Sequence, residues 1–347
     1  MSNTKYQITD DGFGIHTFEL TKSGISRAEF DRIVSGDIKK YYNNKTGSMY
    51  VYPTRNGVRI FLNRVNPNLY NIRVIVSAKK LIDEHSKATA ILNINDDFDM
   101  LGEMVNEVLL ECLGEGFTLN SMCLSRVDLC VNVMLSENFS AERYIKLIKK
   151  SMMRIDNDNI DKFDDSAEKS KHSFRVRTGR ITFTAYDKYY QLEDIGEDYT
   201  KESESLLRLE LAIDSGLLRQ EKIAHEISNL SLLRALTIQS REVFQRYIEN
   251  HFFDGDYYSA DEINAAINFS DYNKIRKKNM HAYLEMQLYK HSFNSIVDEL
   301  VENGWTDYRL KHLILMFEGI NVYPVSMPYR DKHGDKWVPG LRRIFKI

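Results

Sequence analysis

Apolar and polar residues alternate along three segments of the chain, and this alternation predicts strands. Residues 122–135, 180–188 and 205–213 place an apolar side chain at almost every second position, which is the spacing of one face of a β-strand. The alternate positions are mostly polar or charged: Arg126, Asp128, Cys130 and Asn132; Arg180, Thr182, Thr184, Tyr186 and Lys188; Leu206, Arg208, Glu210 and Ala212. Each segment therefore predicts a strand with one apolar and one polar face.

Other patterns add strands and helices around these three. Short β-rich runs predict further antiparallel strands at 48–53, 57–64 and 71–77, and a hairpin that turns at Thr178–Gly179. Helical spacing predicts helices at 27–34, 96–114 and 140–155, and six helical segments after residue 215. Polar stretches at 156–169 and 198–204 predict surface connections.

These elements together predict an α+β protein with two parts. Residues 1–215 are expected to form an antiparallel β-sheet domain with flanking helices. Residues 216–347 are expected to form a mainly helical region, because the composition changes near residue 215.

Composition narrows the class of protein. With 43% hydrophobic and 28% charged residues, the chain has the composition of an ordinary soluble globular protein. The three cysteines have no metal-site spacing and are expected to be buried thiols. The start of the chain is neither basic nor apolar and no long apolar window occurs, so we expect a cytoplasmic protein without a membrane partner.

The polar faces of the three strands suggest a chemistry if the strands share one sheet. Asp128 and Glu210 are hard oxygen ligands that suit Mg²⁺ or Mn²⁺. The Tyr186 hydroxyl could attack a phosphodiester, and Lys188 could balance the charge that develops. The alternative is a half-solvated sheet whose Arg–Asp and Arg–Glu pairs add little stability.

Three sequence motifs resemble one protein family. "LSRVDLCVNV", "RITFTAYDKYYQLE" and "LLRLELAI", in that order, resemble the replication initiators of filamentous phages (the gene II product class) and related plasmid proteins. The earlier "IRVIVSAKKLI" extends the resemblance, which covers about residues 70–213. It implies a nuclease domain that starts rolling-circle replication by nicking one origin strand, retaining the 5′ phosphate on a tyrosine and later rejoining the strand.

The resemblance assigns roles to individual residues. Tyr186 matches the nucleophile and Lys188 its neighbouring lysine, and the two arginines of the flanking motifs match Arg126 and Arg208. Asp128 and Glu210 match the acidic positions, for which the chemistry favours a metal-ligand role. Many relatives have a glutamate where this chain has Gln191, and Tyr189 and Tyr190 are competing nucleophiles. The histidine-paired metal motif of other rolling-circle nucleases is absent.

Basic residues predict where DNA would bind, although the formal net charge is only −3. The candidates lie in the hairpin and in the run "DYNKIRKKNMH": Arg175, Arg177, Arg180, Lys274, Arg276, Lys277 and Lys278. The alternative to DNA binding is that this basic run is simply the solvent-exposed face of a helix. Tyr283, Tyr289 and Tyr308 could stack on bases or pack in a core. The expected partners are double-stranded origin DNA and single-stranded DNA, then a host helicase and polymerase, with a homodimer left open.

Three other functions remain open from the sequence. The chain could be a non-catalytic DNA-binding regulator of replication or copy number. It could be a transfer-type relaxase of an integrative element. The polar sheet face could also be a surface for a protein partner. The intact set of Tyr186, Asp128 and Glu210 favours the nicking enzyme.

Overall fold

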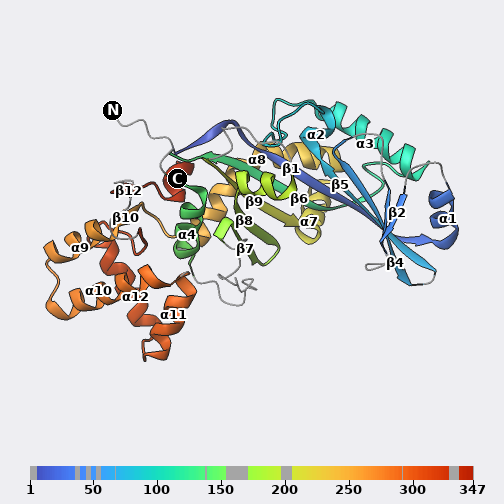
Figure 1. Ribbon diagram of the computed structural model, residues 1–347. Helices are drawn as coiled ribbons and strands as arrows, with labels where there is room; N and C mark the ends of the chain where they lie inside the picture. The colour runs from blue at the N-terminus through green and yellow to red at the C-terminus, as the bar shows by residue number, and fades with distance from the viewer. Residues whose placement is uncertain are drawn as a thin grey trace.

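The protein is an α+β structure built on one large antiparallel sheet (Figure 1). The computed structural model describes residues 6–35, 40–43, 48–51, 56–66, 68–136, 139–153, 171–196, 205–290, 292–327 and 336–346. Within them nine strands pair in the order β2-β3-β4-β5-β1-β6-β9-β8-β7, and each neighbouring pair is antiparallel. The strands are β1 (Gln7–Ser26), β2 (Lys40–Asn43), β3 (Ser48–Val51), β4 (Val58–Asn66), β5 (Leu69–Ser77), β6 (Cys123–Met134), β7 (Ser173–Thr178), β8 (Ile181–Asp187) and β9 (Leu206–Asp214).

The predicted strands are confirmed, including their shared orientation. β6, β9 and β8 are direct neighbours, and their register pairs Cys130 with Glu210 and Glu210 with Thr184. Residues paired across antiparallel strands lie on the same face, so the polar positions of all three strands face one side. The apolar positions, among them Leu129 and Leu209, are buried on the other side.

Helices cover the sheet and extend beyond it. They are α1 (Arg27–Ser35), α2 (Ala78–Ile82), α3 (Phe98–Leu113), α4 (Ala141–Ser151), α6 (Lys188–Ile195), α7 (Ser215–His225), α8 (Asn229–His251), α9 (Ala260–Phe269), α10 (Lys274–Tyr289), α11 (Phe293–Glu302), α12 (Asp307–Glu318) and α13 (Leu341–Phe345). The helices predicted at 96–114 and 140–155 correspond to α3 and α4, and a capping side chain marks the start of each. Asp97 caps α3 by accepting a hydrogen bond from the Met100 amide, and Ser140 caps α4 through the Arg143 amide.

β1 is the longest of the strands that the alternation did not predict. It runs for 20 residues through the centre of the sheet and pairs with β5 on one side and β6 on the other. Its register with β6 shifts at three places, one of them between Ile15 and Thr17. Such bulges interrupt the two-residue period on which a sequence prediction of strands depends.

The large sheet ends and a series of helices begins at Asp214–Ser215. This point does not separate the two hydrophobic cores of the protein. α7 and α8 contribute Leu218, Leu233 and Phe244 to the core under the sheet. A second core, formed mainly by α9–α12, contains buried residues from Ala260 to Val322. Apolar residues within 323–327 and 338–345 belong to the first core again. Figure 1 shows α9–α12 at one end of the molecule and α1 with β2–β4 at the other.

A small second sheet joins the two cores. Its strands are β10 (Tyr257–Ser259), β11 (Ser326–Met327) and β12 (Trp337–Val338), in the order β11-β10-β12. Tyr258 pairs with Ser326, so the chain enters and leaves the second core through neighbouring strands.

Several smaller expectations can be compared with the structure. Cys112 and Cys130 are buried as expected, but Cys123 is exposed because it stands at the first position of β6, where the strand has not yet entered the core. Tyr283 is buried, which excludes stacking on bases, whereas Tyr289 and Tyr308 are each 76% exposed. The connections predicted at 156–169 and 198–204 lie outside the described residues. No described helix is long and apolar enough to span a membrane.

The close contact between β1 and the segment after α2 makes Gly14 a sensitive position. Ile15 and Leu92 exchange two backbone hydrogen bonds, and a Cβ atom on Gly14 would lie 2.0 Å from the Leu92 carbonyl oxygen. We expect Gly14→Ala to lower the free energy of unfolding by roughly 2 kcal/mol or more, since backbone must shift to admit the methyl group. Urea denaturation would measure the change.

Gly102 provides the matched control. Its added Cβ would meet only the end of the Leu230 side chain at 3.0 Å, and Gly102 lies inside α3, where alanine is favoured by up to about 1 kcal/mol. Gly102→Ala is therefore expected to leave the stability unchanged or raise it. Equal losses in the two variants would contradict the role of the Gly14 contact.

Candidate active site on the polar face of the sheet

Tyr186 and Glu210 meet directly on the polar face. The Tyr186 hydroxyl donates a hydrogen bond to Oε1 of Glu210 at 2.7 Å. His16, on β1, lies on the other side of this carboxylate, with Nδ1 at 2.9 Å from the same oxygen. Three strands of one sheet, β8, β9 and β1, thus bring a phenol, a carboxylate and an imidazole together, although 170 residues separate His16 from Tyr186 in the sequence.

Asp128 forms a second acidic centre one strand closer to β1. Its Oδ1 accepts a hydrogen bond from Nε of Arg126 at 2.6 Å, and its Oδ2 accepts one from the Thr17 hydroxyl. The Asp128 residue is only 6% exposed. Both carboxylates predicted from the sequence therefore lie on the polar face, and both are held by hydrogen bonds.

Arg208 lies beside Tyr186 and is completely buried. Its Nε donates to Asn132 Oδ1 at 2.8 Å, and one terminal nitrogen donates to the Thr89 carbonyl. The amide nitrogen of Asn132 donates to the same carbonyl at 2.9 Å. The other terminal nitrogen, Nη1, has no hydrogen-bond partner among the described residues. The backbone near Thr89 therefore covers this end of the polar face.

The helix that follows β8 fixes Lys188. Asp187 caps α6 by accepting a hydrogen bond from the Tyr190 amide at 3.2 Å, as a helix beginning after the strand requires. Lys188 is 2% exposed and donates to Oε1 of Gln191 at 2.6 Å. Tyr190 stacks on His172 with ring centroids 3.9 Å apart.

The two carboxylates have opposite pKa shifts. Burial tends to raise the pKa of Glu210, but the nearby His16, Arg208 and the Tyr186 hydroxyl outweigh it and lower that pKa to about 2. Burial raises the pKa of Asp128, and Arg126 opposes that rise only in part. Burial and the Glu210 charge raise the pKa of Tyr186 well above 10, so its hydroxyl is protonated at neutral pH.

A metal ion would find suitable donors here, although they do not form a ready-made cluster. In the part of the chain that the structure describes, no three His, Cys, Asp or Glu side chains are arranged to hold a metal ion. Glu210, Asp128 and His16 nevertheless supply carboxylate and imidazole donors, which suit Mn²⁺, and the carboxylates suit Mg²⁺. The donor chemistry fits the ion, whose binding would displace the hydrogen bonds now made to the carboxylates.

The predicted DNA-binding residues fall into two groups. Arg175 and Arg177 pair in register with Thr184 and Thr182, so they share the face of Tyr186, whereas Arg180 lies in the hairpin turn. Arg177 also contacts Asp214 at 3.4 Å.

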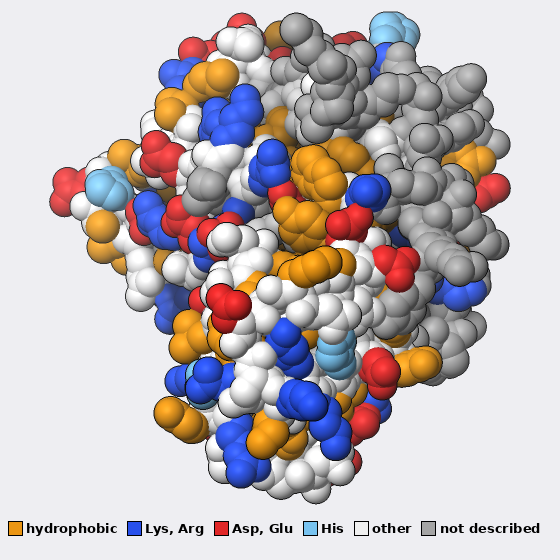
Figure 2. Space-filling view, turned by 90° about the vertical axis from the view of Figure 1, so that its left-hand side faces the viewer, with side chains coloured by type: hydrophobic (Ala, Val, Ile, Leu, Met, Phe, Trp, Pro, Cys, Tyr) orange, Lys and Arg blue, Asp and Glu red, His pale blue; other side chains and the backbone are white. Residues whose placement is uncertain are grey.

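The second group begins α10 and lies away from Tyr186, since α10 packs against α9, α11 and α12. Lys274, Arg276 and Lys278 are exposed, and Lys277 donates to the Asn268 carbonyl at 2.8 Å. Figure 2 views the molecule from the side of these helices, and Lys and Arg side chains gather in the lower part of that face.

His16 and Thr17 are the site residues that sequence reasoning missed. They lie on β1, whose bulge at this position leaves both side chains in contact with the polar-face carboxylates. A search for paired histidines could not find His16, because it acts as a single histidine beside a carboxylate from another strand. No family model matches this chain, and no curated protein matches it.

The lowered pKa of Glu210 predicts how stability depends on pH. A carboxylate whose folded pKa lies below its unfolded value of 4.5 stabilises the fold above that pH, and the contribution disappears as the pH falls toward 2. We expect Glu210→Gln to cost on the order of 3 kcal/mol at pH 7 and less than half of that at pH 3. Urea denaturation at both pH values would test this.

Glu103→Gln serves as the control, because Glu103 is an exposed carboxylate on α3. It should change stability little at either pH. A Glu210→Gln variant that loses the same stability at pH 3 and pH 7 would show that the Glu210 charge is not stabilised by its neighbours.

Proposed function

We propose that the chain is a tyrosine DNA nickase that initiates rolling-circle replication. The observation that supports it most directly is the hydrogen bond from the Tyr186 hydroxyl to Glu210, on a sheet face that also carries Asp128 and two buried cations. Burying a tyrosine hydroxyl, a carboxylate and an arginine side by side costs free energy of desolvation, which a purely structural face would not require. The same arrangement suits attack of the tyrosine on a phosphodiester. The order of the three motifs, which resembles that of phage and plasmid initiators, supports the same function.

In the proposed reaction, the Tyr186 oxygen attacks the scissile phosphorus. A new oxygen–phosphorus bond forms, the bond from phosphorus to the 3′ oxygen breaks, and the 3′ oxygen leaves as a hydroxyl after taking up a proton. The phenol proton would leave along the hydrogen bond that Tyr186 makes to Glu210, whose same oxygen His16 contacts, and the departing 3′ oxygen would take an equivalent proton from the solvent. Rejoining is the reverse step.

The cations near Tyr186 would stabilise the charge on the phosphate oxygens during this step. Arg208 is completely buried beside Tyr186, so it would act on the phosphate through its charge rather than through a direct contact. Glu210 and Asp128 are the residues that would hold Mg²⁺ or Mn²⁺ once their present hydrogen bonds were displaced, and the ion would polarise the phosphoryl group.

The decisive experiment is a covalent-adduct assay on a denaturing gel. The protein is incubated with Mn²⁺ and labelled single-stranded oligonucleotides tiled across DNA that flanks its own gene. We expect a protein–DNA adduct from the wild type and none from Tyr186→Phe, because the variant lacks only the attacking oxygen.

Tyr189→Phe and Tyr190→Phe are the matched controls, because each removes one hydroxyl from a tyrosine in the first turn of α6. Both should keep the adduct. An adduct that survives in Tyr186→Phe would reassign the nucleophile. The absence of any adduct, with DNA binding intact, would favour the non-catalytic regulator, and the absence of DNA binding would favour a surface for a protein partner.

The helical region is proposed to bind duplex DNA through the start of α10. Exchanging Lys274, Arg276 and Lys278 for glutamine removes three exposed charges and should lower the salt dependence of duplex binding by about 0.9 per lost phosphate contact. Fluorescence anisotropy at several salt concentrations would measure the slope. An unchanged slope would show that α10 presents only a solvated face.

A further inference from the structure

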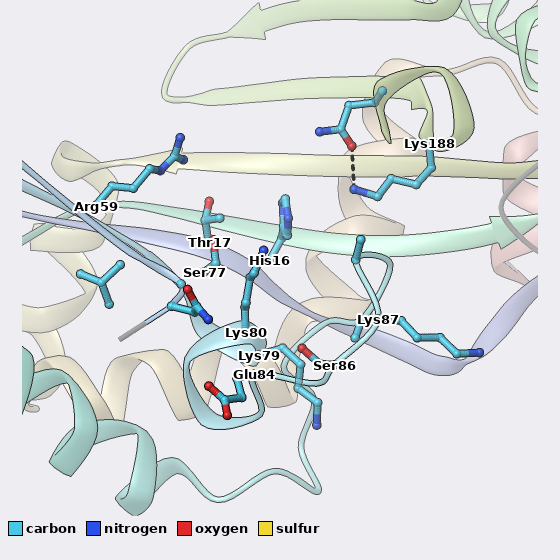
Figure 3. A pocket seen from close by; sticks show the side chains of 16 residues that line it. His16, Thr17, Arg59, Ser77, Lys79, Lys80, Glu84, Ser86, Lys87 and Lys188 are labelled. Atoms are coloured by element: carbon cyan, nitrogen blue, oxygen red, sulfur yellow. Dashed lines mark hydrogen bonds between the residues drawn. The ribbon is translucent and has the colours of Figure 1, made fainter. Parts of the chain in front are cut away.

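A cavity opens beside the Tyr186 site and shares residues with it. It has a volume of about 570 Å³, and its lining includes His16, Thr17 and Lys188. The remaining walls come from the start of β4, the end of β5, and residues 79–90. Figure 3 shows Arg59 and Lys188 approaching the cavity from opposite sides, with Thr17 and His16 between them. A volume of this size suits a ligand as large as a nucleotide.

The described lining is strongly cationic. Five lining residues carry a permanent positive charge at neutral pH, and one carries a negative charge: Arg59, Lys79, Lys80, Lys87 and Lys188, against Glu84. Lys79 is neutralised by Asp96, which lies 2.5 Å from its ammonium group. With Asp96 counted beside the lining, its described residues still include more positively than negatively charged side chains, and this composition favours an anionic ligand.

The chemistry of the walls favours phosphate over a nucleobase. Apart from the imidazole of His16, no aromatic ring occurs among the described lining residues, so the walls offer little surface for base stacking. Hydroxyls of Ser77 and Ser86 and the amide of Gln191 add neutral hydrogen-bonding groups. Contacts of this kind hold a nucleic-acid backbone without reading its sequence.

From these observations we propose that the cavity binds the phosphodiester backbone of single-stranded DNA next to the scissile phosphate. This proposal rests on the proposed nicking function. A tyrosine intermediate holds one end of the cut strand by a covalent bond, so the other end stays near the site only through noncovalent contacts. The cavity adjoins the Tyr186 site through His16, Thr17 and Lys188 and supplies such contacts.

The test compares two double variants with the same change in charge. Arg59→Gln with Lys80→Gln removes two exposed cations from the cavity, and Arg219→Gln with Arg246→Gln removes two exposed cations from α7 and α8. Anisotropy with labelled oligothymidine, without added metal, measures binding from 50 to 200 mM salt. Thermal melts establish that both variants remain folded.

We expect the cavity variant to bind oligothymidine about tenfold more weakly near 0.1 M salt, with a salt slope smaller by about 1.4, which is two single-strand phosphate contacts. The control variant should retain the wild-type affinity and slope. A cavity variant that behaves like the control would overturn the proposal. The proposal would also be overturned if the cavity substitutions abolished the binding of a labelled nucleoside triphosphate but left oligothymidine binding unchanged. The cavity would then bind a free nucleotide.

The proposed function fails in a different way. If no covalent adduct forms with any oligonucleotide but oligothymidine binding depends on Arg59 and Lys80, nicking is refuted and the strand-binding cavity stands. If the adduct forms and the cavity variant gives the same adduct yield at limiting oligonucleotide as the wild type, nicking stands and the cavity proposal is refuted.

Discussion

The buried guanidinium of Arg208 is the interaction on which the polar face depends. A cation removed from water needs compensating partners, and Arg208 has them on three sides: Asn132, the Thr89 carbonyl and the nearby charge of Glu210. The same contacts fasten the segment before α3 over the sheet. A polar face that would otherwise be open to solvent thereby becomes enclosed at one end. This enclosure places Tyr186 in surroundings where its hydroxyl stays protonated and bonded to a carboxylate.

The opposite pKa shifts of Glu210 and Asp128 follow from their neighbours rather than from their depth alone. Both carboxyl groups are largely buried, but Glu210 has cations and a phenol around it, whereas Asp128 is compensated mainly by Arg126. Two acids on one sheet face are thus set for different protonation behaviour. Both accept hydrogen bonds, but Glu210 stays anionic to lower pH, whereas burial makes Asp128 easier to protonate.

The sequence predicts individual strands and the residues that share a strand face well. It predicts contacts between residues far apart in the sequence poorly. Alternation located β6, β8 and β9, and because their registers preserve that alternation, it also predicted which residues share a face. The bulged β1 escaped prediction, and with it His16, since no local pattern links a lone histidine to Glu210. The boundary at residue 215 marked a change of secondary structure. It could not reveal that α7 and α8 pack under the sheet, because helical spacing does not specify the packing partner.

The paired strands β10 and β11 make the group of helices α9–α12 an insertion rather than an extension of the chain. Its two connections lie side by side, with Tyr258 paired to Ser326, and the chain afterwards completes the first core with α13. An insertion of this kind can be exchanged or resized without altering any register of the large sheet. Selection can therefore change the surface that these helices present while the residues of the polar sheet face keep their positions.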